Sequence, residues 1–206
     1  MTTTKKTTTR KPRSTAKKTA KPKVISTAIP ELPANPFAFE VLDAASKQRS
    51  NAKKVQVLQR YIHPSIKTLF IWNFDPTVIS ILPQGEVPYS SAGEQNVSSG
   101  TLSGKINDAV GKMDEMGSRS LGSQDQGQTT IRREFQNFYN FVKGGNDSLS
   151  SLRRETMFIN ILQGLHPREA EILCLVKDKQ LETKYKTITK DIVSAAYPDI
   201  KWGGRS

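Results

Sequence analysis

One apolar stretch, residues 165–176, constrains the fold of this chain most strongly. Proline suits the first position of a helix because its missing N–H would have no partner there, so His166-Pro167 predicts a capping residue followed by a helix start. Lys177 follows at the end of the helix, where the helix dipole favours a positive charge. In the last seven residues of the stretch only Glu171 is polar. A helix that is apolar nearly all round is expected to be the central helix of its domain.

The positive charge of the chain is concentrated at its N-terminus. The 206 residues carry a formal net charge of +12, and the first 23 hold nine basic and no acidic residues, so subtracting nine leaves +3 for the other 183. Residues 1–34 are mainly Thr, Lys, Ala and Pro, which bury too little apolar surface to offset the entropy lost on folding. We expect them to form a disordered basic arm, whose cations are Lys5, Lys6, Arg10, Lys11, Arg13, Lys17, Lys18, Lys21 and Lys23.

Three short helices are predicted in the first half of the chain. Asn35, followed by a proline, provides a capping residue and a helix start, and the apolar spacing that follows ends near Ser46. His63, again followed by a proline, starts the third helix, which ends at Asp75. The second helix between them is expected to bury one face and expose the opposite one, with Val55, Leu58 and Ile62 inside and Lys53, Lys54 and Arg60 outside.

Helical spacing also dominates the second half. Ile131, Phe135, Phe138 and Val142 recur at steps of four, three and four, which predicts an amphipathic helix that the glycines at 144–145 end. The helix after it, capped by Ser148 or Ser150, is expected to face the central helix with Phe158, Ile161, Leu162 and Leu165. A last short helix opens at Thr187 or Thr189 and is expected to bury Ile188, Ile192 and Ala195.

The remaining segments do not have helical spacing. Residues 78–82 predict one strand or an extended crossing, and residues 90–128 are rich in Ser, Gly and Gln, which predicts a flexible insertion with one weak helix around 106–116. The expected fold is therefore all-α, a compact bundle of about six or seven short helices. It would form a single domain over residues 35–200, with a flexible C-terminus at 201–206.

No enzyme motif is present in the sequence: it lacks a phosphate loop, a dinucleotide fingerprint, a nucleophile elbow and a Cys or His cluster. Both histidines lie at predicted helix starts and are interpreted as caps. The single Cys174 excludes an internal disulfide and is expected to be a small buried residue. We predict no enzyme, no metal and no cofactor, and we interpret five carboxylates as solvated: Glu155, Glu169, Glu171, Asp178 and Glu182.

The basic arm gives the strongest functional signal. Cations spaced by Thr, Ala and Pro neutralise phosphates and release counterions, which gives affinity for DNA or RNA that depends on salt and not on sequence. Because the arm lacks aromatic residues, it has nothing to stack on bases. Arg132-Arg133 and Arg153-Arg154 open two neighbouring helices and could extend the positive strip. The alternatives are a solubilising tail and two exposed helix starts.

Four motifs of the folded part resemble an uncharacterised family of proteins from large T4-like tailed phages, including those of cyanobacteria. They occupy residues 82–89, LPQGEVPY; 154–159, RETMFI; 165–171, LHPREAE; and 176–181, VKDKQL. The resemblance covers roughly residues 37–200, and the arm and much of the insertion depart from it. It implies a phage origin and expression in a bacterial host. It brings no activity and no catalytic residues.

Three functions follow from these observations, in order of preference. The first is a non-enzymatic phage protein whose helical domain binds a phage or host protein while the arm binds nucleic acid. The second is a virion or assembly component whose arm anchors it to packaged DNA or to an acidic partner, and the third is an unrecognised enzyme. The expected location is the host cytoplasm, or the virion, with no membrane span because no apolar run approaches about 20 residues. A plastid transit peptide is the alternative interpretation of the N-terminus.

Overall fold

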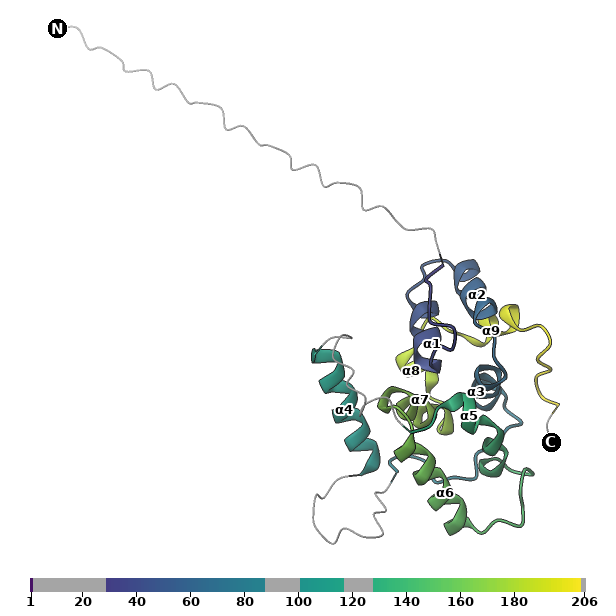
Figure 1. The fold of residues 1–206 in the computed structure, drawn as a ribbon. Helices are drawn as coiled ribbons and strands as arrows, with labels where there is room; N and C mark the ends of the chain where they lie inside the picture. Colours follow the sequence, from purple (N-terminus) through teal and green to yellow (C-terminus); the bar gives the residue numbers. More distant parts are fainter. Residues whose placement is uncertain (2–28, 88–100, 117–127, 205–206) are drawn as a thin grey trace.

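The computed structural model describes residue 1 and residues 29–87, 101–116 and 128–204, and this part of the chain is all-α (Figure 1). The predicted fold class is confirmed. The described residues contain two isolated β-bridges and no strand. Their helices are α1 Ala38–Ser46, α2 Asn51–Arg60, α3 Pro64–Phe74, α4 Leu102–Met116, α5 Ile131–Glu134, the 3₁₀-helix η1 Phe135–Phe141, α6 Ser151–Gly164, α7 Pro167–Lys177, α8 Leu181–Lys184 and α9 Lys190–Ala196.

Helix α7 is the centre of the fold, as predicted. It packs against α1, α3, α4, α6 and α8 (Figure 1). Ala170, Ile172, Leu173 and Val176 are each at most 1% exposed and lie on one broad side of the helix. Cys174 and Leu175, on the other side, are half-buried, so neighbouring elements cover α7 on both sides.

The predicted helix starts at the two His-Pro pairs are confirmed. The Nδ1 atom of His63 accepts a hydrogen bond from the backbone N–H of Ser65 at 3.2 Å, and that of His166 accepts one from Arg168 at 3.1 Å. At the start of α6 the hydroxyl of Ser150 accepts from the Arg153 N–H. Each bond satisfies a backbone donor that the first turn of a helix leaves without a partner.

The predicted start of α1 and the predicted buried faces of α2 and α9 are wrong in detail. Helix α1 begins at Ala38, two residues after the expected proline start, and Glu40 accepts from the Phe37 N–H at its entrance. In α2 the expected faces are rotated, because Lys54 is buried and Ile62 is 52% exposed. The Lys54 ammonium donates to the Thr187 carbonyl oxygen, in the loop before α9. A lysine can be buried between α2 and this loop because its charge has a polar partner there. In α9, Ala195 is likewise exposed instead of buried.

The long amphipathic helix predicted over residues 131–142 is replaced by one α-turn, α5, followed by η1. A 3₁₀-helix has three residues per turn, so Phe135, Phe138 and Phe141 lie on the same face. Phe138 and Phe141 are at most 2% exposed. Val142 is already extended and bridges to Ser80, which makes residues 78–82 an extended crossing and not a strand.

The predicted flexible insertion contains an ordered helix that is longer than expected. Helix α4 begins at Leu102, four residues before the predicted weak helix, and Leu102, Ile106 and Val110 are buried at a spacing of four. These three residues form one apolar stripe along α4, and α4 packs against α7. Residues 90–100 and 117–127 of the predicted insertion lie outside the described residues.

The described ends of the chain are bonded to the helical body. Residues 29–34 belong to the predicted arm, yet the Leu32 N–H donates to the Tyr61 hydroxyl at 2.9 Å and that hydroxyl donates to the Pro30 carbonyl oxygen. At the other end, where flexibility was also predicted, the Trp202 indole N–H donates to Ser194. None of the described helices is both long and apolar enough to span a bilayer.

Candidate functional site

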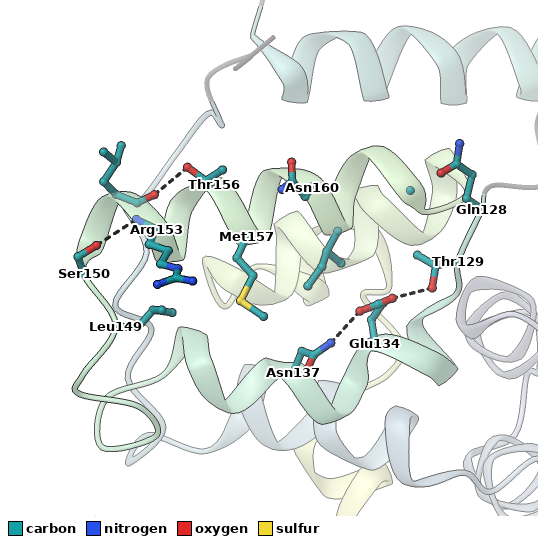
Figure 2. A pocket seen from close by; sticks show the side chains of 13 residues that line it. Gln128, Thr129, Glu134, Asn137, Leu149, Ser150, Arg153, Thr156, Met157 and Asn160 are labelled. Carbon is teal, nitrogen blue, oxygen red and sulfur yellow. Dashed lines mark hydrogen bonds between the residues drawn. The ribbon is translucent and has the colours of Figure 1, made fainter. Parts of the chain in front are cut away.

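A groove of about 840 Å³ runs between α6 and the segment formed by α5 and η1 (Figure 2). Met157 projects from α6 toward the opposite wall, and Ile161, one turn further along α6, also lines the groove, so the two supply its apolar floor. Glu134 and Asn137 rise from that opposite wall, and Arg153 projects into one end of the groove. The groove therefore combines an apolar floor with hydrogen-bonding groups at its rim.

The polar rim is held in place by bonds within the protein. The Glu134 carboxylate accepts from the Thr129 hydroxyl at 2.7 Å and from the Asn137 amide at 2.9 Å. The backbone N–H groups of Gln128 and Thr129 both donate to the Gly164 carbonyl oxygen, which fixes the chain at the far end of α6. Since both Glu134 oxygens are used in these bonds, the carboxylate orders the groove wall.

One end of the groove exposes a large apolar side chain. Leu152, in the first turn of α6, is 74% exposed and lines the groove. Exposed leucines are common on protein surfaces, and this one lies at the edge of the groove, next to Arg153 in the sequence. An apolar floor next to exposed amides and one guanidinium suits a segment of another protein, whose backbone and side chains present the same mixture of groups.

The structure separates the four arginines that the sequence groups in two pairs. Arg154 is buried, and its guanidinium donates to the carbonyl oxygens of residues 140, 146 and 149 at 2.7, 2.9 and 2.9 Å. Arg132 is half-buried, and its Nε donates to the Pro36 carbonyl oxygen at 3.0 Å. Only Arg133 and Arg153 are exposed. The predicted strip of four arginines is therefore not present on the surface.

The nine basic residues predicted to bind nucleic acid in the arm lie outside the described residues. The described chain resumes at residue 29, beside α2 (Figure 1).

Glu169 was predicted to be solvated, and this prediction is wrong. Its side chain is fully buried, and its two carboxylate oxygens accept from the backbone N–H groups of Ala38 and Ile131, both at 2.9 Å. These are the first residues of α1 and α5, so one carboxylate on α7 caps two other helices. Burial raises the pKa of Glu169 above its ordinary value, while the two N–H donors and the nearby Arg132 lower it and oppose the effect of burial.

The other four carboxylates that were predicted to be solvated differ in their exposure and in their ion pairs. Glu155 is half-buried and Glu182 is exposed. Glu171 forms an ion pair with Lys184 across to α8. Asp178 pairs with Lys177 at 2.6 Å.

Lys177 joins two of the motifs on which the family resemblance rests. Its ammonium is nearly fully buried and donates to the carbonyl oxygens of Pro83 at 2.7 Å and Gly85 at 3.2 Å. Asp178 completes the contact by accepting from the Gly85 N–H. The motif at 82–89 is therefore fixed to the end of α7, so these residues have a structural role.

Neither histidine lines the groove. His63 is half-buried, and burial together with Arg132 lowers its pKa. His166 is buried, and its ring stacks on Phe39 with the centroids 4.9 Å apart. Their capping bonds account for both positions.

Cys174 is half-buried, although it was predicted to be buried. Burial of the thiol raises its pKa to about 12, so at neutral pH it is protonated and a poor nucleophile. Within the described residues, no three His, Cys, Asp or Glu side chains gather closely enough to hold a metal ion.

These observations define a class: a small all-helical protein with a central apolar helix and an open groove on one side. The chain belongs to a family of unknown function, DUF6433, whose model matches residues 41–108 and 119–183. The described residues of both parts belong to the folded body, from within α1 to within α8. Comparison with curated proteins and with solved structures gave no match.

Helical spacing could have placed two of the side chains that sequence reasoning missed. Arg154 is four residues before the buried Phe158 on α6, and Glu169 is four residues before the buried Leu173 on α7. Side chains at this spacing lie on the same face of a helix. The groove has no comparable signal, because its two walls come from segments whose packing depends on the whole fold.

Proposed function

We propose that this is a non-enzymatic protein whose basic N-terminal segment binds nucleic acid without sequence specificity and whose helical body binds another protein. The observation that carries the first part is the charge distribution, nine basic residues and no acidic residue in the first 23. A segment of this kind gains affinity by releasing the counterions of the phosphate backbone. Residues 29–34 support the proposal because their bonds to Tyr61 tether this segment to the body at a defined place.

The groove between α6 and η1 supports the second part of the proposal. Its lining includes the exposed Leu152 and the exposed Arg153, and arginine is a residue type enriched in protein interfaces. The described groups in the groove supply no cluster of acid, base and nucleophile. A binding role therefore accounts for this surface better than a catalytic one.

The family resemblance supports a phage protein that acts in the cytoplasm of an infected bacterium. The second candidate is a virion or assembly component whose basic segment anchors it to packaged DNA. Mass spectrometry of purified particles separates these two roles. A protein that acts in the cell is scarce in particles, whereas a structural component is present in a fixed ratio to the capsid protein.

Removal of residues 1–23 tests nucleic-acid binding. The full chain should bind two duplexes of unrelated sequence equally well at low salt, and the shortened chain should bind both much more weakly, as measured by fluorescence anisotropy. Equal affinity of the two proteins would refute the assignment to this segment. A strong preference for one duplex would refute the lack of sequence specificity.

Affinity purification of the tagged protein from infected cells, treated with nuclease, tests protein binding. We expect a partner to remain bound after nuclease treatment and to be lost when the groove carries Leu152→Asp. Ile62→Asp is the matched control, because Ile62 is also an exposed apolar residue but lies outside the groove. Loss of the partner with both variants, or with neither, would contradict the assignment to the groove.

A further inference from the structure

We infer that the outward side of α2, together with the loops before α2 and before α9, forms a second contact for the nucleic-acid backbone, here called the α2 basic surface. It consists of Lys47, Arg49, Lys53, Arg60 and Lys186. The inference rests on the proposed function, and it extends phosphate binding from the N-terminal segment to the folded body.

The sequence of this region lacks acidic residues. Between Asp43 and Asp75 the chain has six basic residues and no Asp or Glu, and a second acid-free stretch with three lysines runs from residue 183 to residue 190. Four members of the surface are exposed, and Lys53 is half-buried. Lys54, the remaining cation of α2, points inward and is not part of the surface.

The fold brings the two acid-free stretches together. The Thr187 hydroxyl donates to the Ser46 carbonyl oxygen at 3.3 Å, and the Lys54 ammonium donates to the Thr187 carbonyl oxygen at 3.3 Å. These bonds place Lys186 close to Lys47, although the two lysines are far apart in the sequence. Helices α2 and α9 also pack against each other.

Most cations elsewhere on the described body have partners that the α2 basic surface lacks. Lys67 pairs with Asp199, and Lys184 pairs with Glu171. Four acidic residues flank the two basic stretches. Asp43 is bonded to the Tyr185 hydroxyl and paired with Arg168, and Asp75 is buried and accepts from Thr77 and Gly203. The other two, at positions 182 and 191, are exposed. No member of the surface forms an ion pair within the described part of the chain. Arg60 lies over the Tyr61 ring, 5.7 Å from its centroid, a contact that leaves its charge uncompensated. Like charges grouped without acidic partners repel one another, so this grouping favours a polyanionic ligand.

The surface ends beside the place where the described chain resumes after the N-terminal segment. Arg60 ends α2 directly before Tyr61, whose hydroxyl bonds to residues 30 and 32. Helix α2 has ten residues, which gives a length of about 15 Å at about 1.5 Å per residue. We therefore expect a phosphate backbone bound by the N-terminal segment to continue along the α2 basic surface.

The test compares two double variants of the full chain in binding to one DNA duplex between about 50 and 200 mM salt. Arg49→Ala with Lys186→Ala removes two charges from the α2 basic surface. Lys105→Ala with Lys143→Ala removes two charges from α4 and from the loop after η1, which lie away from α2 (Figure 1). Circular dichroism of each variant verifies that the body is folded.

We expect the slope of log K against log salt to fall by about 1.8 with the first pair, at about 0.9 per phosphate contact. The control pair should leave the slope unchanged. An unchanged slope with the first pair, or an equal decrease with both, overturns the inference and leaves the proposed function intact. Loss of polyglutamate binding with no change in DNA binding also overturns it, because the surface would then recognise acidic protein. If the unaltered chain does not bind DNA, the proposed function itself fails.

Discussion

Replacement of Glu169 should destabilise the protein more than replacement of any acidic residue on its surface. Glu169→Ala removes the acceptor of two buried backbone N–H groups, one at the start of α1 and one at the start of α5. A buried donor without a partner costs about 1–3 kcal/mol, so the two together cost about 2–6 kcal/mol. Relief from burying the carboxylate offsets part of this cost. We therefore expect the unfolding free energy to fall by about 2–3 kcal/mol.

Two further variants make this prediction specific. Glu169→Gln keeps one acceptor oxygen and replaces the other with a donor, so it should lose about 1–2 kcal/mol, the contribution of one bond. Glu171→Ala, on the same helix, removes a partly exposed ion pair with Lys184 and should cost less than about 1 kcal/mol. Urea unfolding at pH 7, followed by far-UV circular dichroism, measures all three. If Glu169→Ala costs no more than Glu171→Ala, Glu169 does not hold the helices together.

Three other predictions concern buried groups. Arg154→Ala should lower the unfolding free energy by about 2–3 kcal/mol, because three carbonyl oxygens lose their donor. The exposed neighbour is the control, and Arg153→Ala should change the unfolding free energy by less than about 0.5 kcal/mol. Thermal melts that show equal losses for the two variants would contradict this. The pKa of Cys174 is raised to about 12, so little of the thiol is in the reactive thiolate form. At pH 8 it should react with an aromatic disulfide reagent at least about 100-fold more slowly in the folded than in the unfolded chain. Equal rates would exclude a protected thiol. Because the folded pKa of Glu169 is raised above 4.5, the stability that this group contributes is fully present below pH 4.5 and is lost as the pH rises through the folded value. The unfolding free energy of the unaltered chain relative to Glu169→Gln should therefore be larger at pH 4 than at pH 7, and a difference that grows with pH would contradict the raised pKa.

Local signals predicted the helix starts and the central helix well. A histidine before a proline marks a helix start in both places where it occurs, because the proline fits the first turn and the His63 and His166 side chains accept from a free N–H. The apolar character of α7 likewise follows from its own residues. These features depend on neighbours within one or two turns, which the sequence contains.

Features that depend on distant segments were not predicted. Glu169 lies in the first turn of a helix, where an acidic residue is usually solvated, and its partners are 131 and 38 residues away in the sequence. The buried face of α2 depends on the Thr187 carbonyl oxygen, which makes Lys54 an inward residue. Spacing alone did not distinguish an α-helix from a 3₁₀-helix over residues 135–141, since phenylalanines at steps of three can share a face in either helix.

The same reason explains why the site was predicted only in part. The charge excess of the first 23 residues is visible in the sequence, but an arginine at a helix start is ordinarily exposed. The spacing from Arg154 to Phe158 is the one local sign that Arg154 is turned inward, and the pair at 132–133 has no such sign. The groove of Figure 2 and the α2 basic surface both arise where segments far apart in the chain meet. The groove and the α2 basic surface could therefore be located only from the three-dimensional structure.

Phosphate binding by the N-terminal segment is most directly tested by the salt dependence of binding to duplex DNA. The full chain is compared with a chain of equal length in which the nine basic residues of the first 23 are changed to Gln. If all nine contact phosphates, the slope of log K against log salt should decrease by roughly eight, at about 0.9 per contact. Equal slopes for the two proteins would show that these residues do not bind the phosphate backbone.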